Sequence, residues 1–205
     1  MKNSEWGAVA YLTNAVGRIP YINNSNAYIT GSSGVEEDSE ESSTRYAEEN
    51  GDSNTEFAWN TENGVRASST HNIYGVYDLS GGAGEYMATY LEGGTNECMS
   101  SLIANTDTKY VDIYPANADL VGYTSSVTGD ALYETSSEAY NGNTENGSIQ
   151  ASWDGDGSFA PAQSHPVLTR GGFSVTSPLF GVFFFAGSYG EAVLPLGFRP
   201  VLSIQ

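Results

Sequence analysis

The hydrophobic positions at the start of the chain are spaced as in an amphipathic helix. Four side chains recur at i, i+3, i+4 and i+7 and so share one helical face: Trp6, Val9, Ala10 and Thr13. Asn3 or Ser4 is suited to cap such a helix, and Gly17 is suited to end it. The pattern therefore predicts a helix over residues 3–14, with Trp6 as an anchor in the core.

Further along, short runs of alternating apolar and polar residues are typical of strands. These runs contain Tyr74 and Val76, then Tyr86, Ala88 and Tyr90, then residues 167–170 and 181–187, and finally Phe198, Val201 and Ile204. Between the first two runs, the glycine-rich residues 80–84 predict a tight turn. With 24 glycines and few long apolar runs, the chain favours many short strands and turns over a helix bundle.

Two long polar segments interrupt this pattern. The acidic residues 31–54 predict a solvated loop, without the spacing of a calcium-binding EF-hand. Residues 93–169 are rich in Gly, Ser, Asn and Thr. Within them, we expect Trp153 and Phe159 to fasten the segment to the body of the domain.

The acidic charge of the chain disfavours the recognition of some classes of binding partner. In 205 residues, 7 basic against 25 acidic side chains give a net charge of −18. Without clustered Lys and Arg, neither nucleic acid nor an anionic membrane surface is an expected partner. The sequence contains no run of 18 apolar residues that would predict a membrane span, and residues 3–5 do not resemble the start of a signal peptide. The localisation therefore cannot be predicted from targeting signals.

Candidate catalytic groups are scattered along the chain. His71 and His165 belong to no recognisable motif, and no GxSxG or GxGxxG sequence is present. Cys98, the single cysteine, forms no internal disulfide and has no evident base beside it. Pairs of carboxylates stay open as acid–base dyads, although 25 acidic residues bring some together by chance. The residues themselves therefore indicate no catalytic centre.

The terminal block, residues 170–200, differs in chemistry from the rest of the chain. It opens with Arg170-Gly171-Gly172 and closes with Gly197-Phe198-Arg199-Pro200. Between the two arginines Glu191 is the only charged residue, and there is no Asn, although Asn is frequent earlier. Two arginine- and glycine-containing flanks thus enclose residues 173–196, whose composition differs from the rest of the chain. We expect the function of the protein to depend on these residues.

Three segments, in this order, resemble the formylglycine-generating-enzyme family, which has a C-type-lectin-like fold. Residues 4–11 look like that family's EAEWEYA helix, residues 72–86 like its NxYGLYDMxGNVWEW segment, and the terminal block like its RGGSW…GFR ending. The resemblance implies one α+β, C-type-lectin-like domain over residues 1–205, with short strands, few helices and long loops. The family's helix lies mid-domain, so the chain is either a fragment lacking an upstream strand and helix or a shortened version of the fold.

The chain departs from the enzymes of this family at the residues that carry chemistry. No cysteine follows Cys98, where the family needs a redox pair, and two histidines are too few for the related iron-dependent sulfoxide synthases. Catalysis is therefore not implied, and the only cofactor that the resemblance implies is a structural calcium. It places that calcium at a turn with Gly82, Gly84 and Glu85, where Gly82 replaces an Asn ligand.

A non-enzymatic branch of this fold resembles the chain more: the variable proteins of diversity-generating retroelements. There, the segment between RGG and GFRP is rewritten by adenine-specific mutagenesis, mostly of Asn codons. Asn codons ending in a pyrimidine cannot then yield Lys, Gln, Glu, Met or Trp, and among the 24 residues 173–196 only Glu191 breaks this limit. The resemblance implies an adhesin or receptor-binding protein of a phage tail or bacterial cell surface. Its ligand would be a cell-surface protein or another macromolecule.

Alternation along residues 181–187 assigns the terminal side chains to two faces. We expect Val182, Phe183, Phe185 and Phe198 to be buried. The resemblance to the variable proteins implies that the other face is displayed and binds the ligand; we place on it Phe173, Val175, Leu179, Phe180, Phe184, Ala186, Ser188, Tyr189, Val193, Leu194 and Pro195. Two alternatives stay open: an enzyme of the same superfamily with altered chemistry, and a structural surface or tail subunit in which the terminal block is simply core.

Overall fold

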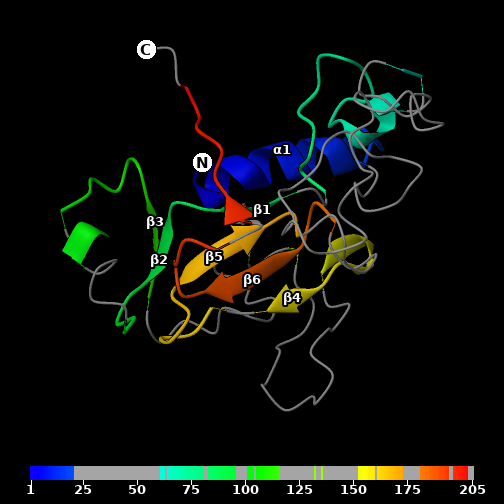
Figure 1. The fold of residues 1–205 in the computed structure, drawn as a ribbon. Coiled ribbons are helices and arrows are strands. Elements are labelled where there is room, and N and C mark those ends of the chain that lie inside the picture. Colours follow the sequence, from blue (N-terminus) through cyan, green and yellow to red (C-terminus); the bar gives the residue numbers. More distant parts are fainter. Residues whose placement is uncertain are drawn as a thin grey trace, which may run out of the picture.

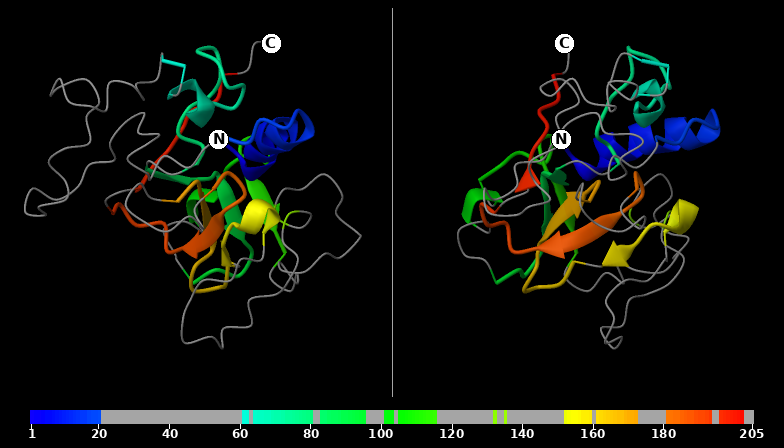
Figure 2. Two further views of the ribbon diagram at one scale, coloured as in Figure 1. Left: turned by 90° about the vertical axis from the view of Figure 1, so that its right-hand side faces the viewer. Right: turned by 45° about the vertical axis from the view of Figure 1, so that its right-hand side comes forward.

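Helix and strand are mixed in this fold, with few helices and a mixed sheet. The computed structural model describes residues 1–20, 61–62, 64–80, 83–95, 101–103, 105–115, 132, 135, 152–159, 161–172, 181–193 and 196–202. Within them, one helix lies along one side of a five-stranded sheet (Figures 1 and 2). No helix in these ranges is long and apolar enough to cross a membrane. The acidic segment 31–54 lies outside the described residues.

Helix α1 (Asn3–Ala15) confirms the predicted helix but not its predicted cap. The N-cap is Lys2, and the Glu5 carboxylate accepts a hydrogen bond from the Lys2 backbone N–H at 2.8 Å. Asn3 and Ser4 both lie inside the helix: the buried Asn3 side chain bonds to Arg170 and Tyr114 instead, and Ser4 is exposed in the first turn.

The end of α1 lies at Gly17, as predicted. Gly17 has a φ of 65°, which glycine adopts without strain. Its N–H donates to the Asn14 carbonyl at 3.0 Å, and the Arg18 N–H donates to the Thr13 carbonyl at 2.8 Å. This pair of bonds satisfies two of the last helical carbonyls and fixes the backbone of Arg18 just beyond the helix.

The five-stranded sheet has the order β4-β6-β5-β1-β7. Its strands are β1 (Gly84–Tyr86), β4 (Ser158–Phe159), β5 (Val167–Arg170), β6 (Phe185–Ser188) and β7 (Leu196–Gly197). β5 is antiparallel to β1 and β6, whereas the β1–β7 and β4–β6 pairs are parallel. The parallel strands β2 (Thr89–Leu91) and β3 (Asp112–Tyr114) form a second sheet. Within the described residues there are also two 3₁₀ helices, η2 (Gly64–Ala67) and η3 (Trp153–Gly155).

The strands predicted over residues 167–170 and around Tyr86 and Tyr90 are present, the former as β5 and the latter split between β1 and β2. The strand predicted at Tyr74 is wrong, because this part of the chain turns and Tyr74 is 89% exposed. The Asn72 side-chain oxygen accepts the Tyr74 N–H at 2.9 Å. Such local bonds compete with strand pairing.

The last predicted strand is shorter than its sequence pattern indicates. β7 ends at Gly197, and Phe198 is 79% exposed, so the prediction that Phe198 is buried is wrong. Arg199 is the residue that faces the domain: its carbonyl accepts a hydrogen bond from the Met1 ammonium at 2.7 Å, and its side chain pairs with Glu85. Because neighbouring side chains of an extended segment point to opposite sides, an inward Arg199 turns Phe198 outward.

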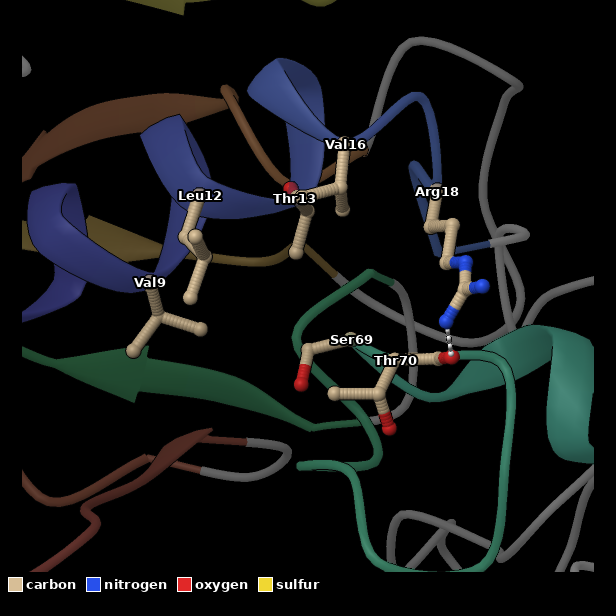
Figure 3. Close-up of a pocket in the computed structure, with 7 residues that line it drawn as sticks. All are labelled: Val9, Leu12, Thr13, Val16, Arg18, Ser69 and Thr70. Carbon is tan, nitrogen blue, oxygen red and sulfur yellow. Dashed lines mark hydrogen bonds between the residues drawn. The ribbon is translucent and has the colours of Figure 1, made fainter.

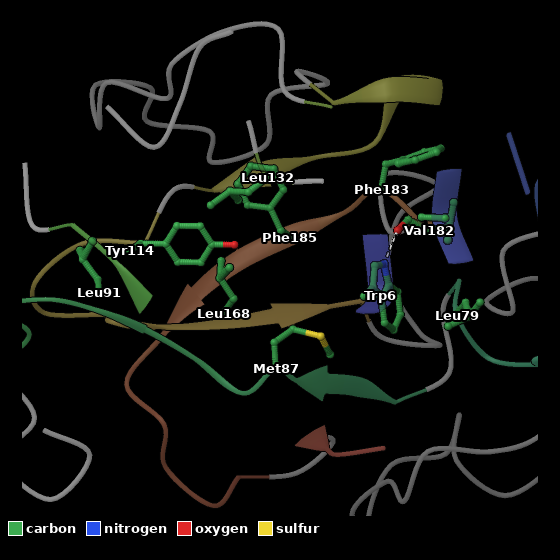
Figure 4. Close-up of a cluster of buried hydrophobic side chains, with 11 residues drawn as sticks. Trp6, Leu79, Met87, Leu91, Tyr114, Leu132, Leu168, Val182, Phe183 and Phe185 are labelled. Atoms are coloured by element: carbon green, nitrogen blue, oxygen red, sulfur yellow. Dashed lines mark hydrogen bonds between the residues drawn. The ribbon is translucent and has the colours of Figure 1, made fainter. Parts of the chain in front are cut away.

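The core lies between α1 and the sheets. It contains Trp6, Ala10, Leu79, Met87, Leu91, Tyr114, Leu132, Leu168, Val182, Phe183 and Phe185. Trp6 is confirmed as an anchor, since it is fully buried and its Nε1–H donates to the Val182 carbonyl at 2.8 Å (Figure 4). Trp153 packs edge-on against Phe183, as expected for a residue that fastens its segment to the body of the domain.

Candidate functional site

The turn at residues 181–184 forms the root of the terminal block, and side chains from other segments hold its main chain. Asp156, which is 3% exposed, accepts hydrogen bonds from the N–H groups of Gly181 at 3.0 Å and Phe183 at 2.8 Å. Arg170 is fully buried and donates from Nη1 to the Phe183 carbonyl at 3.3 Å. The Asp156 carboxyl group thus binds main-chain N–H groups of this turn, and the Arg170 guanidinium binds one of its main-chain carbonyls.

Arg170 connects the terminal block to the rest of the domain. Its Nε donates to Asn3 Oδ1 at 2.8 Å, and Asn3 Nδ2 in turn donates to the Tyr114 hydroxyl at 2.9 Å. The guanidinium also lies 5.2 Å from the centre of the Phe185 ring. Through these contacts the arginine of the RGG sequence binds α1 and β6 directly and β3 through Asn3, which explains how a full charge is tolerated inside the core.

The carboxyl group of Asp156 that holds this turn has a shifted pKa. Burial raises the pKa of Asp156 to about 7, against the opposing effect of the hydrogen bonds from Phe183 and Gly181, and the negative charge of Asp154 adds to the rise. Gly181 permits the close approach, because a Cβ at this position would lie 2.2 Å from Asp156 Oδ1. The turn therefore depends on both a glycine and a carboxyl group.

The assignment of Phe184 to the displayed surface is wrong. Phe184 is 4% exposed, and its ring packs at 6.1 Å, edge-on, against Phe159. Strand alternation fails here because residues 181–184 form a turn and β6 begins only at Phe185. The predicted burial of Val182, Phe183 and Phe185 is confirmed.

The other predicted ligand-binding residues divide between exposed and undescribed positions. Phe173, Val175, Leu179, Phe180, Leu194 and Pro195 lie outside the described residues. Ala186 and Ser188 on β6 are half-buried, whereas Tyr189 is 51% and Val193 is 46% exposed. In the described part of the terminal block, the exposed predicted side chains are therefore concentrated after β6.

Residues 189–193 form an exposed loop that two residues from outside the terminal block support. The Tyr86 hydroxyl donates to the Glu191 carbonyl at 2.7 Å and lies 3.1 Å from the Ser188 hydroxyl. The His165 ring lies against the Tyr189 ring, with 3.9 Å between their centres. The loop is thus held at Tyr189 and Glu191, and the side chains of Glu191, Ala192 and Val193 are exposed.

Only two of the three residues of the calcium site implied by the resemblance, Gly84 and Glu85, lie among the described residues. Gly82 lies outside them, Gly84 is buried in β1, and the Glu85 carboxylate is 6% exposed. Arg199 Nε lies 3.1 Å from each Glu85 carboxylate oxygen. The described residues contain no group of three or more His, Cys, Asp or Glu side chains placed to hold a metal ion. Glu85 is thus already paired with a cation of the chain itself.

Sequence reasoning missed the residues that support the terminal block from elsewhere. Asp156 stands among other acidic and glycine residues, and Asn3 resembles an ordinary helix cap. The sequence around Tyr86 and His165 does not predict their contacts with the terminal block. Tyr86 and Ser188, for example, are 102 residues apart in the chain. Only the tertiary structure brings these groups together.

Comparison of the chain with protein-family models, with curated proteins and with solved structures finds no match.

Proposed function

We propose that this chain is a non-enzymatic ligand-binding protein with a C-type-lectin-like fold, an adhesin or receptor-binding protein that displays part of residues 173–196. Its sequence resemblance to the variable proteins of diversity-generating retroelements motivates the class. One structural observation carries the proposal: Asp156, Arg170 and Trp6 hold residues 181–184 through main-chain atoms. Main-chain bonds do not involve the side chains beyond this turn, so exposed residues such as Tyr189 and Val193 can change while the turn itself stays fixed.

The burial of Phe184 moves the boundary of the proposed display surface. Residues 181–185 are buried and belong to the core, as the structural-subunit alternative expects for the whole terminal block. Tyr189 and Val193 do not fit that alternative, because about half of each side chain is exposed. Within the described residues the proposed surface therefore begins at Ala186 and centres on residues 189–193. Exposed tyrosines are frequent in binding hot spots, and Tyr189 lies here beside Gly190, Glu191 and Ala192.

The nucleotide sequence around the gene gives the sharpest test of this proposal. We expect a reverse-transcriptase gene nearby, together with a near-copy of the DNA encoding residues 173–196 that is rich in Asn codons. Sequencing of populations should then find substitutions at codons for exposed positions such as Tyr189 and Val193, and an unchanged codon for Arg170. A locus with neither the reverse transcriptase nor the near-copy would contradict the retroelement class.

A protein-level experiment separates display from a purely structural block. Tyr189→Asn and Val193→Asn should leave the urea denaturation midpoint almost unchanged, whereas Phe183→Ser serves as the buried control and should unfold the domain readily. Binding to cells of the natural host, measured with fluorescently labelled protein, should fall for the two exposed variants. Large losses of stability for all three variants would instead support the structural-subunit alternative.

A further inference from the structure

A groove lies along the C-terminal half of α1, at the opposite end of the helix from its contacts with Arg170. It has a volume of about 310 Å³ and lies between the helix and the turn at Ser69 and Thr70 (Figure 3). This volume is at the lower end of the range for small-molecule sites. None of its lining residues belongs to the terminal block, so the groove is separate from the proposed display surface.

The helical wall of this groove is aliphatic. Val9, Leu12 and Val16 line it, and Leu12 and Val16 are 61% and 53% exposed. Since each helical residue advances the axis by about 1.5 Å, the wall from Val9 to Val16 is about 10 Å long. Such a wall suits a short alkyl chain that would cover side chains now in contact with water.

Arg18 supplies the one charged side chain of the groove. Its Nη1 donates to the Thr70 carbonyl at 3.0 Å, which holds the guanidinium at the end of the aliphatic wall. No carboxylate in the described ranges pairs with Arg18, although the chain carries 25 acidic residues. A guanidinium has five N–H donors, so donors beyond the one used for Thr70 are available to an anion.

The remaining polar atoms of the groove are used within the protein. The Ser69 hydroxyl accepts the Val76 N–H at 3.0 Å, the Thr70 hydroxyl donates to Asn72 Oδ1 at 3.0 Å, and the Thr13 hydroxyl donates to the Ala10 carbonyl at 2.7 Å. A ligand rich in hydroxyl groups, such as a sugar, would therefore find few partners here. The net charge of −18 also disfavours polyanions.

From this geometry we infer that the α1 groove binds a small aliphatic monocarboxylate. Its carboxylate pairs with the Arg18 guanidinium, and its alkyl chain lies along Val9, Leu12 and Val16. This site does not depend on the proposed function of the terminal block, and either can fail without the other.

The test uses octanoate as the probe and 1-octanol as its uncharged counterpart, each titrated against the full chain by isothermal calorimetry and two-dimensional NMR. We expect saturable binding of octanoate and at least tenfold weaker binding of octanol. Arg18→Gln should weaken octanoate binding about tenfold and abolish its advantage over octanol, whereas Leu12→Asn should weaken both ligands. Lys109→Gln removes a cation outside the groove and serves as the matched control, with octanoate affinity unchanged.

The inference is overturned by the absence of saturable octanoate binding, by equal affinities for octanoate and octanol, or by equal effects of Arg18→Gln and Lys109→Gln. The comparison of the two ligands needs only the unmodified chain, so it decides the question even if a variant does not fold. Chemical-shift changes should centre on residues 9–18 and 69–70, and changes centred on residues 186–193 would count against the groove.

Discussion

Replacement of Asp156 by Asn should change how the stability of the domain depends on pH. The pKa of Asp156 is raised by burial from 3.8 to about 7. The folded protein therefore holds this proton more tightly than the unfolded chain. Below about pH 4 both states are protonated and Asp156 has no effect on the pH dependence. Between about pH 4 and 7 the unfolded chain releases its proton first, so stability falls as pH rises, and above pH 7 the loss is complete.

The size of this effect follows from the same two values. One pKa unit corresponds to about 1.4 kcal/mol, so the rise from 3.8 to about 7 corresponds to a loss on the order of 4 kcal/mol across this pH window. Asp156→Asn is a neutral isostere that lacks the ionisation. As pH rises from about 4 to 7, the natural chain should lose this free energy of unfolding and Asp156→Asn should not. The variant should therefore gain about this amount of stability relative to the natural chain.

Urea denaturation followed by tryptophan fluorescence, at intervals between pH 4 and 8, measures this difference. Asp107→Asn is the matched control, because Asp107 is exposed and its Oδ1 also accepts a backbone N–H, that of Lys109 at 2.8 Å. The control should run parallel to the natural chain. If Asp156→Asn also runs parallel, or loses stability relative to the natural chain as pH rises, the carboxyl group is ionised in the turn and the reasoning from burial is wrong.

Three further predictions concern single substitutions. Phe184→Ser should lower the unfolding free energy by about 3–5 kcal/mol in chemical denaturation, because the ring is buried. Tyr189→Asn should lower it by less than about 1 kcal/mol, because Tyr189 is exposed, and similar costs for the two variants would refute the burial of Phe184. Gly181→Ala should lower the melting temperature strongly, since its Cβ meets a carboxylate oxygen, and an unchanged melting temperature would show that the turn can relax. Arg199→Gln leaves the buried Glu85 without its cation and should cost about 1–3 kcal/mol in urea denaturation, whereas no cost would indicate that another group neutralises this carboxylate.

The sequence alone predicted those features that depend on local spacing. Helix α1, its end at Gly17 and the burial of Trp6 follow from a periodicity within about fifteen residues, and all are present. The exposure of Phe184 was predicted wrongly because its turn is held by Asp156, which no local pattern connects to it. Whether Phe198 faces inward depends on the pairing of Arg199 with Glu85, a contact between residues 114 positions apart. Alternation identifies two faces but not which one meets the domain.

The buried polar contacts of α1 also determine when this chain can fold. Asn3 finds its partner at Arg170, 167 residues later, and Trp6 finds its partner at Val182, 176 residues later. Closing contacts over such separations makes folding slow and places it late. During synthesis the first helix therefore stays without its buried partners, and Trp6 stays uncovered, until Val182 has been made. The residues that complete the core are those at the root of the terminal block, so any sequence change that disturbs that root should stop folding before a ligand is ever met.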